Sequence, residues 1–288
     1  MRHVFIINPT SGVGKYRVLL KWLTQQHDLK YEIVYTEYVG HAIEIAKRYK
    51  KKDTILYSVG GDGTAHEVLN GLQKGVRFAI IPTGTGNDFY RVIGDRKKLE
   101  EIIERTVLHG KDKWIDVGRL NDRLFLNVAN IGIDAAINKR TNETDLKYIP
   151  NELGYAVSAL KEVFKIKPYN FKLKLDDEFE DISITLLSIM NGQYYGGGFR
   201  SAPLSEIDDG FLDLCIVDSV SLLRAVSLVP KYLKGKHLDL KEVTYKKVKS
   251  LEIKSDVPLT YGTDGEIFEA TDIKVDILEK YCLLRIPG

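Results

Sequence analysis

The residues with the clearest chemical potential are Gly-Gly-Asp-Gly-Thr at positions 60–64, which follow an apolar run and precede an amphipathic segment. Three glycines let a backbone approach a polyphosphate closely, and a helix that starts directly afterwards adds favourable partial charge. A carboxylate among phosphate-binding amides would repel the anion unless a divalent cation lay between them, so Asp62 implies Mg²⁺. A tight strand-to-helix turn capped by the aspartate is the alternative, and it explains one glycine but not three.

An earlier loop, residues 6–15, reads Ile-Ile-Asn-Pro-Thr-Ser-Gly-Val-Gly-Lys. It is not a Walker A loop, because Pro9 stands where that pattern needs a glycine and Tyr16 where it needs serine or threonine. A dinucleotide fingerprint would need a glycine where Arg17 stands. What remains is a turn after a strand, followed by a helix-like segment whose backbone N–H groups can face an anion.

A third loop, Pro-Thr-Gly-Thr-Gly-Asn-Asp at residues 82–88, follows another apolar run, and Asn87 or Asp88 is placed to cap a helix. Loops at the carboxyl ends of successive parallel strands converge, and ligands characteristically bind there. We therefore predict one composite nucleotide site to which all three loops contribute.

The elements that would position these loops alternate between two patterns. Apolar runs predict strands at 4–7, 31–36, 54–59 and 77–81. Amphipathic segments predict helices at 16–23, 41–49 and 65–72, the last stopped by Gly75. This region is predicted to be an α/β domain, residues 1–120, with a parallel sheet flanked by helices.

The second half of the chain has period-2 runs separated by turn residues, which predict mainly antiparallel strands. Two helices interrupt them, near 152–164 and 222–233. We predict a mostly-β sandwich domain, residues 121–288, whose last strand can pack back on the first domain.

Composition narrows the class of protein. The chain has 42 Lys and Arg residues against 40 Asp and Glu, so it lacks the basic field that non-specific nucleic-acid binding needs. Cys215 and Cys282 both stand in apolar strand-like runs, which favours buried reduced thiols and a cytoplasmic protein. No stretch approaches the roughly 20 apolar residues of a membrane span. A lipid substrate would therefore require peripheral contact with a membrane surface.

Six short motifs follow one another between Asn8 and Glu266: NPTSG, GGDGT, PTGTGND, NGQYYGGGFRSAP, IDDGFLD and TDGE. Together they resemble the diacylglycerol kinase catalytic domain family, which includes bacterial soluble lipid kinases and sphingosine kinases. The resemblance implies a transferase of phospholipid metabolism that uses ATP and Mg²⁺ to phosphorylate the hydroxyl of a lipid alcohol such as diacylglycerol. It also implies a nucleotide cleft between the two domains.

Carried over residue by residue, the resemblance places nucleotide contacts on two loops and two single threonines. They are Asn8, Pro9, Thr10, Ser11 and Gly12; Thr36; Gly60, Gly61, Asp62, Gly63, Thr64, Ala65, His66 and Glu67; and Thr85. The family often has asparagine where His66 stands. We expect this histidine in the first turn of a helix, facing solvent or near phosphate rather than taking part in catalysis.

The Thr-Asp-Gly-Glu motif places Asp264 and Glu266 two residues apart, a spacing that in an extended chain points both carboxylates the same way. Phosphoryl transfer to an alcohol needs a carboxylate that orients the hydroxyl and takes its proton. The resemblance assigns this work here, with Asp264 and Glu266 both candidates for the general base and Asp62 as the third catalytic carboxylate. A plain hairpin turn is the alternative.

An acidic turn, Ser-Glu-Ile-Asp-Asp-Gly-Phe, occupies residues 205–211. Oxygen ligands gathered by a turn can hold a hard cation, although a solvated acidic turn is the common alternative. The resemblance implies a structural Mg²⁺ on the side chain of Asp209, with further oxygens from Glu206 and the backbone of Phe211.

Two other functions stay open. NAD kinases and phosphofructokinases also use a Gly-Gly-Asp-Gly loop, but they lack the PTGTGND and GGGFRSAP pair. A nucleotide-binding regulatory module without turnover would have lost the base, whereas this chain keeps Asp264 and Glu266. The sequence does not identify the acceptor lipid, and it leaves the oligomeric state open, a homodimer included.

Overall fold

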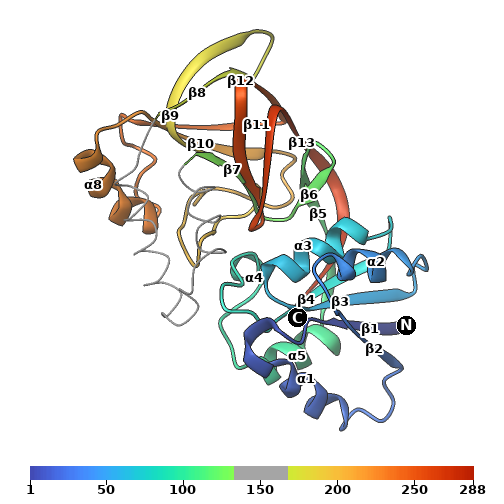
Figure 1. Cartoon of the computed structure of the whole chain (residues 1–288). Coiled ribbons are helices and arrows are strands. Elements are labelled where there is room, and N and C mark those ends of the chain that lie inside the picture. The colour runs from blue at the N-terminus through green and yellow to red at the C-terminus, as the bar shows by residue number, and fades with distance from the viewer. Residues whose placement is uncertain (133–167) are drawn as a thin grey trace. The chain divides into compact units, whose positions relative to one another are not determined.

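The computed structural model describes residues 1–132 and 168–288 (Figure 1). The chain forms two compact units. Unit 1 consists of Met1–Asp116 and Glu279–Gly288, and unit 2 consists of Val117–Leu278.

Unit 1 contains a parallel sheet built from the apolar runs at the start of the chain. Its strands are β1 (Arg2–Ile7), β2 (Tyr31–Tyr35), β3 (Thr54–Gly60) and β4 (Arg77–Pro82). β1 pairs with β2 and β3, and β3 pairs with β4. The far side of β4 pairs with the last residues of β13 (Glu266–Ile286), a strand that begins in unit 2. All seven residues of β3 are buried, as in a parallel sheet covered on both faces.

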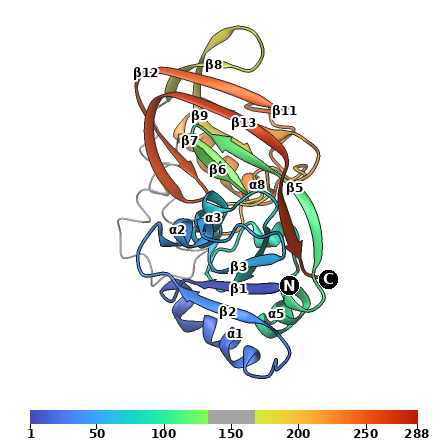
Figure 2. The same ribbon diagram turned by 90° about the vertical axis from the view of Figure 1, so that its right-hand side faces the viewer.

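Helices cover the two faces of this sheet in pairs. Figure 2 shows α1 (Tyr16–Leu23) and α5 (Leu99–Val107) on one face, and α2 (His41–Lys47) and α3 (Asp62–Gly71) on the other. A 3-10 helix, Ser11–Gly14, precedes α1, and the short α4, Tyr90–Ile93, follows the third loop. The face under α1 and α5 is filled by Leu19, Trp22, Leu23, Ile103 and Val107 from the helices and by Phe5, Ile7, Ile55, Tyr57, Val59, Ala79 and Ile81 from the strands.

Helix α3 ends at Gly71, one residue before the end that the sequence predicts, and Leu72 is already extended. Gly75, the predicted stop, lies beyond the end of the helix. A Cβ atom on Gly71 would lie 2.3 Å from the carbonyl oxygen of Ile43, so α2 and α3 approach backbone to backbone at this residue. Gly75 has φ +84° and instead forms the turn into β4.

Unit 2 is an antiparallel β structure. Its strands are β6 (Arg123–Phe125), β7 (Val128–Gly132), β8 (Tyr169–Lys174), β9 (Phe179–Met190), β10 (Leu212–Asp218), β11 (Val243–Val248), β12 (Ser250–Thr263), the first part of β13 and the last part of β5 (Lys111–Leu120). The main order is β11-β10-β9-β7-β12-β13. Strands β7 and β8 follow one another along the same edge of β9, because Gly132 pairs with Leu186 and Tyr169 pairs with Ile184. The helix predicted near 152–164 lies outside the described residues.

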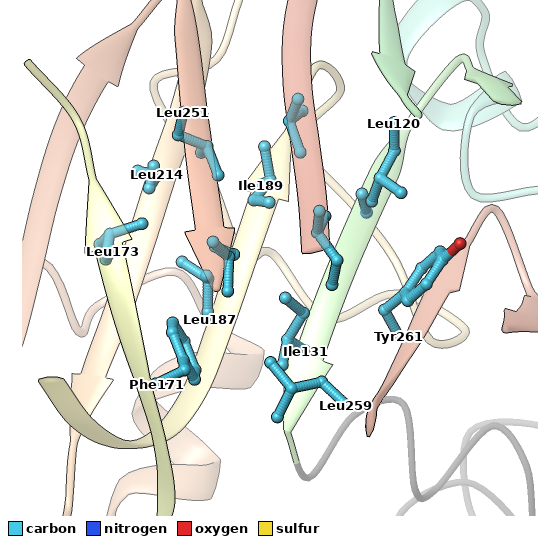
Figure 3. Packing of buried hydrophobic residues seen from close by; sticks show 14 of the residues in the cluster. Leu120, Ile131, Phe171, Leu173, Leu187, Ile189, Leu214, Leu251, Leu259 and Tyr261 are labelled. Carbon is cyan, nitrogen blue, oxygen red and sulfur yellow. The ribbon is translucent and has the colours of Figure 1, made fainter. Parts of the chain in front are cut away.

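Apolar side chains fill unit 2 on both faces of its strands. One cluster, shown in Figure 3, includes Leu120, Ile131, Phe171, Leu187 and Tyr261. The second cluster lies under α8 (Leu222–Leu233), the helix that the sequence predicts near 222–233. The hydroxyl of Ser221 caps this helix by accepting the N–H of Arg224 at 3.4 Å. None of the helices within 1–132 and 168–288 is long and apolar enough to cross a membrane.

Candidate functional site

Two of the predicted glycine loops meet in unit 1 through their backbones. The carbonyl oxygen of Gly60 accepts N–H bonds from Thr83 (2.9 Å) and Gly84 (3.0 Å), which joins the loop after β3 to the loop after β4. A Cβ atom on Gly84 would lie 2.4 Å from the Cα atom of Gly61. Only glycine allows this approach, so the two motifs depend on each other sterically.

The first loop reaches the same place. Gly12 has φ +64°, and a Cβ atom there would lie 1.7 Å from the carbonyl oxygen of Thr83. The Asn8 amide nitrogen donates to Thr64 Oγ1 (3.2 Å), while its oxygen accepts the N–H (3.0 Å) and the hydroxyl (2.7 Å) of Thr10. Asn8 thereby ties the first loop to the first turn of α3.

Asp62, the predicted magnesium residue, is the first residue of α3, and its carboxylate holds the third loop. Oδ2 accepts the N–H of Asp88 at 3.1 Å and Oδ1 accepts the N–H of Phe89 at 3.3 Å. The capping role that the sequence offered as an alternative is therefore present, but it serves the turn before α4 rather than α3. A carboxylate oxygen has two lone pairs, so Asp62 can still coordinate Mg²⁺ while it makes these bonds.

The N-terminus of α3 has the features of an anion cradle. Gly61 is extended at the N-cap and, as a glycine, has no side chain with which to cap the helix. A Cβ atom on Gly63 would meet no atom within 4 Å, and Gly63 is exposed. Open space beside the first backbone N–H groups of a ten-residue helix fits a phosphate group, which these groups and the helix dipole would stabilise.

Most of the other residues predicted to contact the nucleotide lie in or next to the same loops. Ser11 Oγ would be 3.7 Å from a Cβ atom on Gly61, and the half-buried Pro9 precedes it in the first loop. The N–H of Thr36 bonds to the carbonyl oxygen of Ile7 at 2.9 Å, which fixes the end of β2 against the end of β1. Thr85 is exposed in the third loop. The N–H of Ala65 is already bonded to Gly61 O at 3.1 Å, so it closes the first turn of α3.

Two other residues predicted to contact the nucleotide have structural roles. Glu67 accepts the N–H of Gly40 at Oε1 (2.9 Å) and the N–H of Ala42 at Oε2 (3.1 Å), so its carboxylate caps the N-terminus of α2. His66 is fully buried, with its Nε2 3.3 Å from Asn70 Nδ2. Of the two expected positions, facing solvent is wrong, because position 66 belongs to the broad buried face of α3, and a position near phosphate stays a prediction.

In unit 2, the Thr-Asp-Gly-Glu motif forms a two-residue hairpin turn between β12 and β13. Thr263 pairs with Glu266, while Asp264 (φ +46°) and Gly265 (φ +98°) both have left-handed conformations, as a type I′ turn requires. The expectation that an extended chain points both carboxylates the same way is wrong, because left-handed turn residues break the alternation of a strand.

The two carboxylates of this hairpin have different surroundings. Asp264 is buried, and its side chain accepts three backbone N–H bonds, from Leu126 (2.6 Å), Asn127 (3.0 Å) and Val128 (2.9 Å). It therefore holds the chain between β6 and β7 against the hairpin. Glu266 is half-buried at the start of β13. Asp264 thus has the contacts of a structural carboxylate, which favours Glu266 as the one that meets an acceptor.

Sequence reasoning missed the asparagines that support this hairpin. Asn191 Nδ2 donates to the carbonyl oxygen of Leu126 at 2.7 Å, and the N–H of Asn191 bonds to Asn127 O at 2.9 Å. Both asparagines are buried, at 0% and 5% exposure. Asn191 opens the NGQYYGGG motif and could have been found from it, whereas nothing local marks Asn127.

The predicted metal set in the acidic turn does not fit a divalent cation as it stands. Asp209 accepts the N–H of Phe211 at 3.0 Å and forms an ion pair with Lys247 through its other oxygen, while Glu206 is exposed. The hydrogen bond to Asp209 raises the pKa of Lys247, which keeps its ammonium charged. In the described part of the chain, no group of three or more His, Cys, Asp or Glu side chains is placed to hold a metal ion.

Comparison with known families gives a match to each half of the chain. Residues 2–120 match the diacylglycerol kinase catalytic domain, and residues 127–282 match the YegS C-terminal NAD kinase beta sandwich-like domain.

Individual proteins give the same result over most of the chain. A diacylglycerol kinase of Staphylococcus saprophyticus is 30% identical, with 91% of this chain and 87% of that protein covered. A diacylglycerol kinase of Bacillus subtilis is 28% identical, with 91% and 88% covered. The crystal structure of a diacylglycerol kinase from Bacillus anthracis superposes with a TM-score of 0.74 at 23% identity, covering 100% of this chain and 97% of that one, which shows a shared fold.

Proposed function

This chain belongs to the diacylglycerol kinase catalytic domain family, and we propose that it is a lipid kinase that transfers the γ-phosphoryl group of ATP to a lipid hydroxyl. The observation that carries this proposal is the meeting of three glycine loops at the glycine N-cap of α3 in a chain that also keeps Glu266. Diacylglycerol or a related lipid alcohol is the proposed acceptor.

On the donor side, backbone N–H groups at the start of α3 would bind the phosphates, and the first loop from Asn8 to Gly12 would close over them. Asp62 would bind Mg²⁺ while it fixes the third loop through Asp88 and Phe89. Bound Mg-ATP supplies the phosphoryl group and neutralises part of its charge. Thr36 and Thr85 would contact the rest of the nucleotide from the ends of their strands.

On the acceptor side, Glu266 would orient the lipid hydroxyl and accept its proton as the phosphoryl group transfers. Asp264 would act as a positioning residue, because its three bonds to the segment 126–128 hold the hairpin that carries Glu266. The reaction needs both half-sites around one pair of substrates. We therefore propose that the nucleotide and the lipid meet in a cleft to which each unit contributes one half-site.

The proposal is tested by transfer of label from [γ-³²P]ATP to a panel of lipid alcohols in mixed micelles, with diacylglycerol, a sphingoid base and phosphatidylglycerol as acceptors. NAD and fructose 6-phosphate serve as the soluble acceptors of the alternative kinases. We expect Mg²⁺-dependent labelling of one lipid and of neither soluble acceptor. Labelling of NAD alone would show that the protein is an NAD kinase and not a lipid kinase. Nucleotide binding without transfer to any acceptor would indicate a regulatory module.

We further propose that the protein meets its substrate by peripheral contact with an anionic membrane through the outer face of α8. Leu223 and Leu233 are exposed on this helix by 84% and 43%. Lys231, Lys234 and Lys236 are exposed beside its C-terminal end. Apolar side chains next to a cluster of lysines are the combination that anionic bilayer surfaces attract.

Vesicle flotation tests this surface. Binding should be stronger to vesicles containing phosphatidylglycerol than to phosphatidylcholine alone, and high salt should weaken it. A Lys231→Glu, Lys234→Glu double variant should lose most of the binding, whereas Lys50→Glu, Lys51→Glu in unit 1 should not. Attachment that resists salt and needs detergent for release would contradict a peripheral mode.

A further inference from the structure

The acidic turn at 205–211 is closed by a lysine from a neighbouring strand. Lys247 on β11 pairs directly with Asp213 on β10, so both side chains leave the same face of the strand pair. Lys247 Nζ bonds to Asp209 Oδ2. The second oxygen of Asp209 accepts the N–H of Phe211 at 3.0 Å. Asp62 accepts the N–H groups of Asp88 and Phe89, which are neutral backbone donors, whereas one oxygen of Asp209 is bonded to a positively charged group.

Other charges at this turn favour a monovalent cation that belongs to the chain. Asp213 is fully buried directly opposite Lys247, and a buried carboxylate is costly without a positive charge nearby. Lys249 Nζ lies 5.3 Å from the ring centroid of Phe211. A divalent cation bound to Asp209 would meet the ammonium group of Lys247 on the same carboxylate, and like charges at such short range repel strongly.

We propose that the ammonium group of Lys247 takes the place of a divalent cation in this chain, so that the turn at 205–211 is stable without metal. The lysine is part of the folded chain, and its contribution to stability does not depend on the concentration of Mg²⁺ in solution. This inference goes beyond the proposed kinase function, because it concerns the stability of unit 2 and not turnover.

The turn is connected to the hairpin that carries Glu266. Ser205 Oγ donates to the carbonyl oxygen of Asn191 at 2.8 Å, and Gln193 Nε2 donates to Ser205 O at 3.0 Å. Asn191 in turn bonds to Leu126, whose N–H is held by Asp264. Lys247 therefore closes a turn from which a series of hydrogen bonds leads to the acceptor half-site.

The experiment compares thermal unfolding of the full chain in EDTA and in millimolar MgCl₂, without nucleotide. The wild type should have the same Tm in both. Lys247→Met should lower the Tm in EDTA by about 3–10 °C, because it removes the ion-pair partner of Asp209 and the positive charge opposite the buried Asp213, and Mg²⁺ should restore part of the loss. Lys246→Met is the matched control, since Lys246 is exposed on the same strand and pairs with Leu214.

Three results would overturn the proposal. The first is a wild-type Tm that rises with Mg²⁺ and loses this rise in Asp209→Asn. The second is a Lys247→Met variant that behaves as Lys246→Met does, or that loses stability without any response to Mg²⁺. The third applies if Lys247→Met fails to fold, and it uses Mn²⁺ binding followed by electron paramagnetic resonance. The wild type and Asp209→Asn should bind equal numbers of Mn²⁺ ions. One site fewer in Asp209→Asn would show that Asp209 binds a metal ion.

Discussion

The donor half-site in unit 1 and the acceptor half-site in unit 2 are built by different means. In unit 1 three loops meet through their backbones at Gly12, Gly60, Gly61 and Gly84. A Cβ atom on Gly12, Gly60 or Gly84 would lie under 3 Å from a neighbouring atom. In unit 2 the corresponding contacts come from a carboxylate whose partners are distant in the sequence, because Asp264 binds the segment 126–128.

This difference determines how reliably a sequence motif predicts the role of its residues. A glycine that is needed for a close approach is visible in the sequence as a glycine, and its neighbours in the loop supply the rest of the site. A carboxylate is ambiguous until its partners are known, because the same aspartate can bind a metal, take a proton or hold a turn. A single substitution in one unit should therefore have a different effect from a single substitution in the other.

The largest expected effect is on Asp62. Asp62→Asn should abolish phosphoryl transfer, because it removes the charge that would bind Mg²⁺ and replaces one acceptor of a backbone N–H by an amide donor. Transfer of label from ATP measures this, with Asp95→Asn, 73% exposed in its side chain, as the control. Turnover within about tenfold of the wild type, or 1.36 kcal/mol of barrier, would speak against the role.

The second prediction separates the two carboxylates of the hairpin. Glu266→Gln should lower the transfer rate by about 10²–10⁴-fold while nucleotide affinity stays near that of the wild type. Asp264→Asn should instead destabilise unit 2 by about 2–3 kcal/mol, because an amide cannot accept all three backbone N–H bonds.

Calorimetric ATP titration, label transfer and urea unfolding on the same preparations distinguish these outcomes. If Asp264→Asn is stable and inactive while Glu266→Gln is active, the two assignments are reversed. If both variants keep near-normal rates, the base lies elsewhere and the motif is a plain turn.

The third prediction concerns the glycines of unit 1. Gly12→Ala should destabilise the unit by more than about 2 kcal/mol and lower ATP affinity, because its Cβ atom would lie 1.7 Å from Thr83 O at a residue with φ +64°. Gly63→Ala is the matched variant in the same half-site: its Cβ atom meets nothing within 4 Å, so stability should change by less than about 0.5 kcal/mol. Equal losses of stability in the two variants would show that close backbone approach is not what builds this site.

These contacts also explain which parts of the fold and of the candidate site could be predicted from the sequence. The strands of unit 1 and helices α1 and α8 were predicted to within about two residues, because their apolar periodicity is local. The start of α3 was missed by three residues, since the helix begins at Asp62 inside the glycine loop and not at Ala65. The exposure of His66 and the shape of the hairpin were predicted wrongly. The roles of Asn127 and Lys247 were missed, because each depends on a partner from a distant part of the chain. The family resemblance supplied the substrate class, which no local pattern contained.

The smallest expected effect uses a buried histidine to compare the two units. Burial, with help from the nearby Arg285 charge, lowers the pKa of His3 in unit 1 to about 4, and its Nδ1 lies 2.9 Å from Tyr57 Oη. Burial also lowers the pKa of His237 in unit 2, whose Nε2 lies 3.0 Å from Ser201 O. The unfolded chain therefore takes up these protons first, so stability is greatest above the unfolded pKa of about 6.5 and falls as the pH drops toward the folded value.

For His3 the loss between pH 7 and pH 5 should be about 2 kcal/mol, confined to unit 1. His3→Asn, which keeps an amide near the position of Nδ1, should reduce this loss, measured as the shift in the urea midpoint between the two pH values. His27→Asn, at an exposed position in the same unit, should keep it in full. If His3→Asn and His27→Asn lose stability equally on acidification, His3 is not the group that titrates. If only His237→Asn reduces the loss, the acid sensitivity belongs to unit 2.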